Sequence, residues 1–404
     1  MEKKYWDIND IIIILTTFFA VSTITQRVFP FSVNRIVGIV LLMCLVADMV
    51  FHANRKKIVW WMLVAVLFGV SVLVSEDLKY NLESYIYWMT TLFLLHKLTR
   101  ASASEMLLEA FAKNRFIVKL LLWLYTACNT LFLFIPECYE SYWGWGGRGY
   151  FQGYASTPHT LASASCLFIT LACLYLLLQG LDVVVLIGLL VSLLSVFQSG
   201  ARVFLISAVC IVLVASYILF RNIQYRLAFW CVGGAAFVVM FLKSGMMDKF
   251  TAVISNKTTD VLAAFTNARS TIWAIDLREF GKASLIQKII GHGFDYVPKI
   301  NQMYYGDPIW AHNDFVQLLL SVGVLGLAIY LLSIADVVAK MKCSSFFVKF
   351  FFVIYIMLPA FMNGLYIYQH LVYSVFYLWL IAGLYSRRDI YLRTVIKKGL
   401  TKKI

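Results

Sequence analysis

Three side chains in this sequence could together carry out chemistry on an anionic substrate: His312, Arg202 and Arg269. A neutral histidine can accept a proton from a hydroxyl group, which speeds a reaction roughly 10²- to 10⁴-fold. Two arginines can bind a pyrophosphate through paired hydrogen bonds and stabilise the charge that develops on it as it leaves. This combination suits glycosyl transfer from a lipid pyrophosphate.

Each of the three residues also has a simpler structural explanation. His312 comes just before Asn313 and Asp314, which are good N-cap residues for a helix, and could be only an interfacial histidine. Arg269 could hold lipid phosphate from the surface of an amphipathic helix. Arg202 could be a snorkelling charge at a helix start, but its predicted external position disfavours positive charge and calls for an anionic partner.

The composition identifies the elements that must position these residues. Hydrophobic residues make up 61% of the 404 residues and charged residues 14%, and the mean hydropathy is +0.80. So much apolar surface could not be buried in one soluble core. The sequence therefore predicts an all-α polytopic membrane protein, with residues 1–404 forming a single integral domain that has no internal repeat.

About 12 apolar runs are long enough to be transmembrane helices. They lie near residues 9–26, 36–51, 58–75, 83–98, 117–135, 159–179, 182–199, 202–220, 226–242, 313–334, 347–364 and 366–386. The first run follows Lys3 and Lys4 and lacks a small-residue cleavage site, so it is predicted to be an uncleaved span.

The distribution of Lys and Arg predicts the orientation. Most of these residues fall in loops on one side and in the C-terminal tail, whereas the short loops on the other side carry only Arg27, Arg35, Lys79, Arg148 and Arg202. Because cytoplasmic loops retain positive charge, both termini are predicted to lie inside. The net charge of +14 then reflects topology and attraction to anionic lipids, and the basic residues are too scattered for nucleic-acid binding.

Two external excursions interrupt the apolar pattern. Residues 136–158 mix aromatic residues with glycine, which could either stack on sugar rings or form an interfacial aromatic belt. Residues 243–312 form a large extracytoplasmic loop, and His312 lies where this loop meets the next span. Water-soluble chemistry could meet a membrane-bound substrate at that boundary.

The large loop carries a helical pattern over residues 259–290, in which Arg269 shares a face with Ile272 and Trp273. Gly291 is expected to end this pattern. Pro298, Gly306 and Pro308 are expected to keep the remainder of the loop irregular.

Three segments together resemble the O-antigen polymerase and O-antigen ligase superfamily of bacterial membrane proteins. The first looks like the family's serine-x-x-arginine signature, the second like its external-loop arginine and tryptophan before a Gly-x-Gly turn, and the third like its His-Asn pair before a leucine-rich span. They are Ser199-Gly200-Ala201-Arg202, Ala268-Arg269-Ser270-Thr271-Ile272-Trp273 with Gly291-His292-Gly293-Phe294, and His312-Asn313-Asp314-Phe315 leading to Leu318, Gly323, Leu325 and Gly326. The match covers about residues 195 to 335.

The resemblance implies that Arg202 and Arg269 hold the pyrophosphate of a polyprenyl-linked oligosaccharide and that His312 engages the acceptor hydroxyl. Arg278, Asn313 and His292 are further candidates for substrate binding, although His292 could only shape its turn. The resemblance also implies inversion at the anomeric carbon, a site facing outward from the bacterial inner membrane, and a chain-length regulator and a flippase as possible partners. The sequence has no external Asp-x-Asp pair and no His or Cys ligand set, so a metal-independent reaction without a cofactor is expected.

Polymerase, ligase and transporter remain as alternatives. Residues 312–318 and the Gly-His-Gly-Phe turn look more like polymerases, whereas ligases often have a second histidine where this chain has Trp310. A flippase or other transporter would also be polytopic and basic. Transporters commonly carry buried charges at the membrane midplane, but Asp48, Glu83 and Asp182 fall near span ends.

Overall fold

The computed structural model describes residues 6–29, 32–74, 76–100, 102–141, 149–244, 266 and 269–386. Within them about 80% of the chain is helical, in 17 α-helices, which confirms the all-α class. The predicted helical residues 259–265, 267 and 268 lie outside the described part, as does Arg148 in the first excursion.

The helices occupy two stretches of the chain, on either side of the large loop. The first stretch contains α1 (Ile8–Ser22), α2 (Val33–His52), α3 (Arg55–Leu73), α4 (Leu78–Leu98), α5 (Ala103–Lys113), α6 (Arg115–Phe132), α7 (Pro158–Gln179), α8 (Val183–Gln198), α9 (Arg202–Leu219) and α10 (Ile223–Lys243). The second contains α13 (Arg269–Lys282), α14 (Leu285–Ile290), α15 (Tyr296–Tyr305), α16 (Asp314–Ser321), α17 (Gly323–Ala339), α18 (Phe346–Met362) and α19 (Gln369–Leu384).

Seven of the described helices are long and apolar enough to cross a membrane: α1 with its short extension Thr23–Thr25, α2, α3, α6, α7, α9 and α10. Four more, α8, α17, α18 and α19, are apolar but shorter. The chain is therefore built as a membrane protein.

Side-chain caps fix where many of these helices begin. The first N–H groups of a helix have no partner within it, and a short polar side chain supplies one. Capping hydrogen bonds of this kind come from Asp7, Ser32, Asn54, Asp77, Thr157, Asp182, Asn222, Ser284, Asn313 and Ser345.

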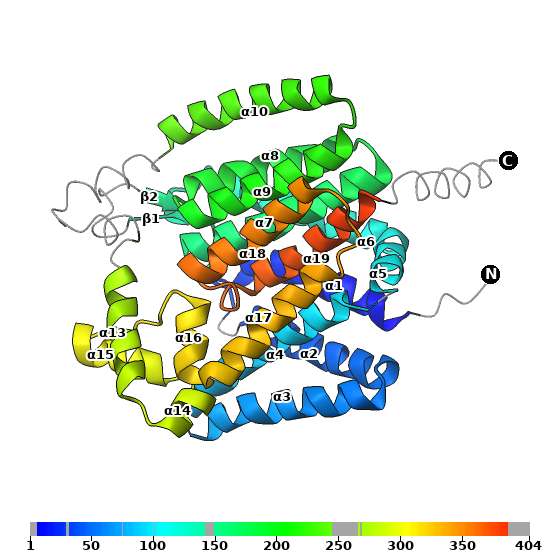
Figure 1. The fold of residues 1–404 in the computed structure, drawn as a ribbon. Helices are drawn as coiled ribbons and strands as arrows, with labels where there is room; N and C mark the ends of the chain where they lie inside the picture. Colours follow the sequence, from blue (N-terminus) through cyan, green and yellow to red (C-terminus); the bar gives the residue numbers. More distant parts are fainter. Residues whose placement is uncertain are drawn as a thin grey trace.

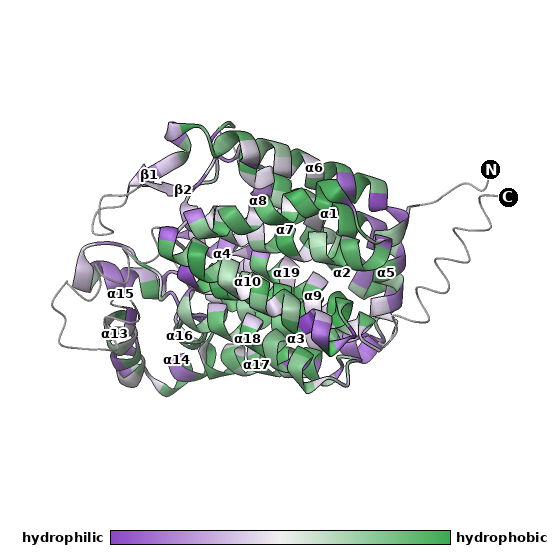
Figure 2. Cartoon of the chain, turned by 90° about the horizontal axis from the view of Figure 1, so that it is seen from above, coloured by the Kyte–Doolittle hydropathy of each residue, from purple (hydrophilic) through white to green (hydrophobic). Residues whose placement is uncertain are grey.

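The apolar helices form one bundle around α7, which packs against α8, α9 and α19 (Figure 1). Polar residues gather at the ends of the bundle, most of all on α13 and α15 (Figure 2). α10 lies at the periphery, and none of its residues is buried. It contacts the bundle through aromatic rings, Trp230 on Phe347 and Phe237 on Phe197.

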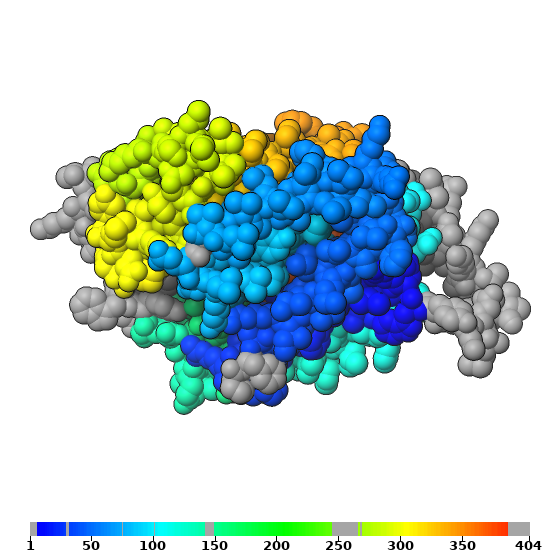
Figure 3. Space-filling view, turned by 90° about the horizontal axis from the view of Figure 1, so that it is seen from below, coloured from blue at the N-terminus to red at the C-terminus, as the bar shows by residue number. Residues whose placement is uncertain are grey.

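Helices α13 to α15 form a cap at one end of the bundle, beside the connection between α3 and α4 (Figure 3). Lys299 of α15 pairs with Glu76 of that connection at 2.9 Å, and Asp295 accepts a hydrogen bond from the Glu76 N–H at 3.1 Å. The cap shares a small apolar core with α16 and the segment before it, formed by Ile272, Trp273, Val297, Ile300, Ala311, Val316 and Leu320.

The predicted continuous span over residues 313–334 is wrong, because the chain breaks at Val322 between α16 and α17. Gly323 has a left-handed backbone, with φ of 73°, and a Cβ there would lie 2.3 Å from the Ile289 carbonyl oxygen. Gly291 is left-handed as well, and its Cβ would lie 2.2 Å from the Ser321 oxygen. The Gly-x-Gly turn therefore packs backbone against backbone onto this break.

The end of the helical pattern at Gly291 is confirmed, but the prediction that the next residues are irregular is wrong. They form α15, which contains Pro298 in its first turn and ends at Gly306 with φ of 82°. Proline is tolerated there because the first-turn N–H groups have no partner within the helix.

One further helix and a pair of strands were not predicted. α5 is an amphipathic helix that buries Leu107, Leu108 and Phe111. Within residues 136–158, β1 (Tyr139–Ser141) pairs antiparallel with β2 (Gly149–Phe151). Aromatic residues favour such strands, and the rings of Tyr139 and Phe151 contact each other across the pair at a tilt of 47°, with centroids 5.3 Å apart.

Candidate functional site

Arg202, Arg269 and His312 come from three separate elements. Arg202 is the first residue of α9, Arg269 is the first of α13, and His312 lies two residues before α16. The charge of Arg202 acts on Arg269, and the charge of Arg269 acts on His312. The structure therefore brings the three predicted catalytic residues into one cluster, and all three side chains are half-buried.

A tight turn between α8 and α9 presents Arg202. α8 ends at Gln198, and the Ser199 hydroxyl donates a hydrogen bond to the Val196 carbonyl oxygen at 2.7 Å. Gly200 is left-handed, with φ of 64°, which lets the chain reverse within a few residues. The Ser-Gly-Ala-Arg segment is thus the turn of a helical hairpin, and its arginine is the first residue of the second helix.

Arg269 fastens the cap to the bundle. Its guanidinium donates a hydrogen bond to the carbonyl oxygen of Met362, the last residue of α18. The last carbonyl groups of a helix have no partner within it and carry its negative dipole end, so a cation is favourable there. The pKa of Arg269 is lowered to about 10, mainly by burial; Tyr368 opposes this effect, and the charge of Arg202 adds a smaller lowering.

His312 has an unusual backbone and a half-buried side chain. It is the one non-glycine residue with positive φ in the described chain, at 52°. Its ring lies 4.3 Å from that of Trp310, and its Nδ1 is buried without a hydrogen-bond partner among the described residues. Burial and, second, the charge of Arg269 lower the pKa of His312 to about 3. The imidazole is therefore neutral at neutral pH.

The segment just before α16 is held by hydrogen bonds with α13 and with α16. Trp273 donates a hydrogen bond from Nε1 to the Ala311 carbonyl oxygen at 2.7 Å, and the Ala311 N–H donates to Gln317 at 3.3 Å. Gly364 lies under Trp310, where a Cβ would come within 2.5 Å of the indole. The tryptophan that follows Arg269 in the sequence thus positions the segment that carries His312.

Asn313 is an N-cap, as predicted. Its side-chain oxygen accepts hydrogen bonds from the N–H groups of Phe315 at 2.9 Å and Val316 at 3.1 Å. The residue is 2% exposed, and this oxygen is therefore already used by the helix.

Arg278 and His292 lie away from the cluster. Arg278 is nine residues beyond Arg269 on α13, roughly 13 Å along the helix, and it is exposed beside the ring of Tyr304. His292 donates its N–H to Leu320, near the end of α16 opposite His312, and its ring stacks on Tyr296 at 4.0 Å. It shapes the turn that meets the α16–α17 break.

Two residues of this region were not found from the sequence. Tyr368 acts on Arg269, and its ring contacts that of Phe204, two residues after Arg202, at 5.1 Å. Asp314 is fully buried and accepts hydrogen bonds from the Tyr330 hydroxyl at 3.0 Å and the Leu365 N–H at 2.8 Å. Neither carries a local sequence signal, because Tyr368 falls within an apolar run and Asp314 within a capping pair.

Two arginines beside a neutral histidine can bind an anion and accept a proton next to it. Among the described residues, no group of three or more His, Cys, Asp or Glu side chains could hold a metal ion. No family model matches this chain, and no curated protein matches it.

Proposed function

We propose that this protein is a polymerase that joins polyprenyl-pyrophosphate-linked oligosaccharide repeat units into an O-antigen or capsular polysaccharide on the outer face of a bacterial inner membrane. The observation that carries the proposal is the cluster of Arg202, Arg269 and His312, from segments about 40 to 110 residues apart in the sequence. Two guanidinium groups close together in a partly buried site can bind one anion between them through charge-assisted hydrogen bonds. A pyrophosphate supplies that anion.

The reaction needs one bond to form and one to break. The hydroxyl oxygen of one glycan attacks the anomeric carbon of the other, and the carbon–oxygen bond to pyrophosphate breaks. His312 accepts the hydroxyl proton. The bonding electrons leave with polyprenyl pyrophosphate, whose charge Arg202 and Arg269 stabilise. Attack from the face opposite the leaving group inverts the anomeric centre.

The architecture is compatible with the proposed topology. The seven long helices, the four shorter apolar ones and α4 correspond in order to the twelve predicted spans, with α17 as the main part of the tenth. With both termini inside, the ends of α8, α9 and α18 at the cluster face outward. The cap would then lie at the outer surface, where lipid-linked glycans present their sugars.

The proposal is tested by incubating the purified protein with a polyprenyl-pyrophosphate-linked repeat unit alone. Growth of a ladder of longer glycans supports polymerase activity. Transfer only after addition of lipid A-core supports a ligase, and failure of both reactions leaves a transporter such as a flippase.

His312→Ala is expected to reduce ladder formation by at least about 10²-fold while the protein remains folded, because the variant loses the proton acceptor. The measurement is the initial rate of glycan extension by purified protein. Full activity of the variant would remove His312 from the mechanism. Lys282→Ala serves as the control, since Lys282 lies on the exposed surface of the same cap helix.

Arg202→Lys and Arg269→Lys keep the charge but lose the planar fork that binds two phosphate oxygens. Each is expected to lower kcat/KM for the lipid-linked donor by about tenfold or more. Donor kinetics that match the wild type in both variants would contradict the pyrophosphate role.

A further inference from the structure

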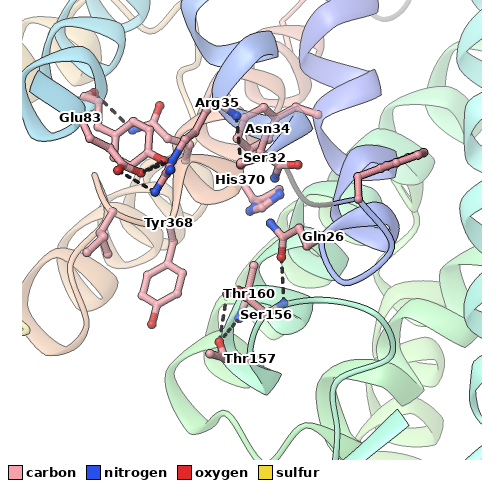
Figure 4. A pocket seen from close by; sticks show the side chains of 15 residues that line it. Gln26, Ser32, Asn34, Arg35, Glu83, Ser156, Thr157, Thr160, Tyr368 and His370 are labelled. Atoms are coloured by element: carbon pink, nitrogen blue, oxygen red, sulfur yellow. Dashed lines mark hydrogen bonds and ion pairs between the residues drawn. The ribbon is translucent and has the colours of Figure 1, made fainter. Parts of the chain in front are cut away.

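A cavity of about 540 Å³ with both polar and apolar lining lies beside the cluster, between α2, α4, α7 and the start of α19. Figure 4 shows Arg35 and Glu83 on one side of it, Thr157 and Thr160 on the other, and His370 between them. Its volume falls within the range of small-molecule sites, about 300 to 1,000 Å³.

The charges in the cavity wall cancel. Arg35 and Glu83 form a two-point pair, with Nε to Oε1 at 3.0 Å and the second guanidinium nitrogen to Oε2 at 2.8 Å. The Tyr87 hydroxyl also donates to Glu83, at 2.9 Å. Among the residues that the structure describes, no other Asp, Glu, Lys or Arg lines the cavity. The wall therefore fits a neutral ligand, unlike the cationic cluster next to it.

The remaining polar groups suit a ligand with several hydroxyls. The side-chain oxygen of Asn34 accepts a hydrogen bond from Ser22 at 2.6 Å, and that of Gln26 accepts one from the Ser156 N–H at 2.8 Å. With their oxygens used in this way, both amides can offer NH₂ donors to a ligand. Thr160 adds a hydroxyl, and Phe19, Phe29, Tyr87 and Tyr368 add aromatic side chains to the wall.

Part of the wall is fixed in advance. His370 is 3% exposed, and both its ring nitrogens are engaged, Nε2 with the Thr23 hydroxyl at 2.7 Å and Nδ1 with the Ser163 hydroxyl at 3.2 Å. Gln369, next in the wall, donates to the Tyr87 carbonyl oxygen at 3.2 Å. A preorganised wall loses little entropy when a ligand binds.

Tyr368 connects the cavity to the cluster. It lines the cavity, acts electrostatically on Arg269, and contacts Phe204 of α9. A ligand in the cavity would thus adjoin the arginines, with its neutral part in the cavity and any anionic part at the cluster.

We propose that this cavity is a saccharide subsite that holds a neutral sugar of the glycan next to the reacting pyrophosphate. The hydroxyls of the sugar would bond to the Arg35–Glu83 pair and to the amides of Asn34 and Gln26. The identification of the ligand as a sugar of this glycan rests on the proposed function. The balanced charge and the polar groups of the cavity wall are features of the structure itself.

The test measures binding of two probes to the full-length protein in lipid nanodiscs. One probe is the repeat-unit oligosaccharide released from its lipid by mild acid, and the other is undecaprenyl pyrophosphate without sugar. Glu83→Gln and Asn34→Leu are expected to weaken oligosaccharide binding about 10- to 100-fold and to leave undecaprenyl pyrophosphate binding unchanged. Glu83→Gln preserves side-chain shape, so it remains informative if Asn34→Leu fails to fold.

Arg27→Gln is the matched control. It breaks the Arg27–Glu140 pair, which has a 2.9 Å contact and lies outside the cavity lining. Binding of both probes should match the wild type.

The outcomes separate this proposal from the proposed function. Wild-type oligosaccharide affinity in both Glu83→Gln and Asn34→Leu, or no oligosaccharide binding to the wild type, overturns the subsite even if a glycan ladder forms. Weakened binding in the cavity variants supports the subsite even if the wild type forms no ladder, in which case the polymerase proposal fails. Extension of the free oligosaccharide by the wild type assigns the subsite to the acceptor, and inhibition without extension assigns it to the donor.

Discussion

At the residue scale, His312 is a weaker base in the free protein than an ordinary histidine. Burial and the nearby positive charge of Arg269 lower its pKa to about 3. General-base catalysis works best when the pKa of the base lies near the working pH. A pyrophosphate bound at Arg269 would offset the second of these causes and raise the pKa of His312. Donor binding would then make His312 a stronger base.

This account predicts different pH profiles for kcat/KM and kcat. The profile of kcat/KM reports the free protein, so His312 should add no acid limb near its ordinary pKa of about 6.5. The profile of kcat reports the loaded protein, and its acid limb should lie at higher pH. The measurement is the initial rate of glycan extension from pH 4 to 8 at limiting and saturating donor. Coincident limbs near pH 6.5 would contradict the account.

At the element scale, the cap contains a buried carboxyl group on α13. Asp276 is fully buried, and burial raises its pKa to about 7, against a smaller opposing effect of its polar neighbour Asn301. The folded cap therefore binds this proton more tightly than the unfolded chain does. By linkage, its stability is greatest below about pH 4 and falls as the pH rises to about 7, by up to ~1.4 kcal/mol per pH unit.

Asp276→Asn is expected to remove this slope and to stabilise the cap most at and above pH 7, because the amide carries no charge to bury. Hydrogen exchange of α13 and α15 between pH 5 and 8 measures the effect. Equal protection in the variant and the wild type at pH 8 would show that the folded cap does not raise the pKa of Asp276. Asp307→Asn, an exposed change in the same cap, is the control.

The sequence alone predicts the elements that local pattern determines. Hydropathy locates the apolar helices, and the residue types at Asn313 and Gly291 predict a helix start and a helix end. The break at Val322 could not be predicted, because it depends on Gly291 and Gly323 meeting across some 30 residues of chain. The sequence does not predict α15, because a proline usually breaks a helix and only the structure places Pro298 in a first turn.

The residues of the site divide in the same way, into those with a local sequence signal and those that depend on helix packing. His312, Arg202 and Arg269 stand out because charge and histidine are rare in an apolar chain. Tyr368 and the Arg35–Glu83 pair do not stand out, because their positions at the cavity depend on which helices pack together. A tyrosine in an apolar run has the same sequence signal whether it faces lipid, core or cavity.

At the scale of the whole molecule, the proposed topology makes a prediction that does not depend on catalysis. Met303 is 76% exposed in the cap, and Lys56 is exposed at the other end of the bundle, at the start of α3. In a background with exposed Cys231 replaced by serine, Met303→Cys should react with a membrane-impermeant maleimide in intact spheroplasts. Lys56→Cys should react only after permeabilisation. The reverse pattern would invert the orientation.

The peripheral position of α10 bears on how the whole molecule should be handled. Since none of its residues is buried, the surrounding lipid contributes more to its placement than the protein does. Removing lipid would therefore act on α10 before it acts on the packed helices around α7. The choice of detergent could therefore change the structure. The first part to move would be α10, the helix that leads into the large loop.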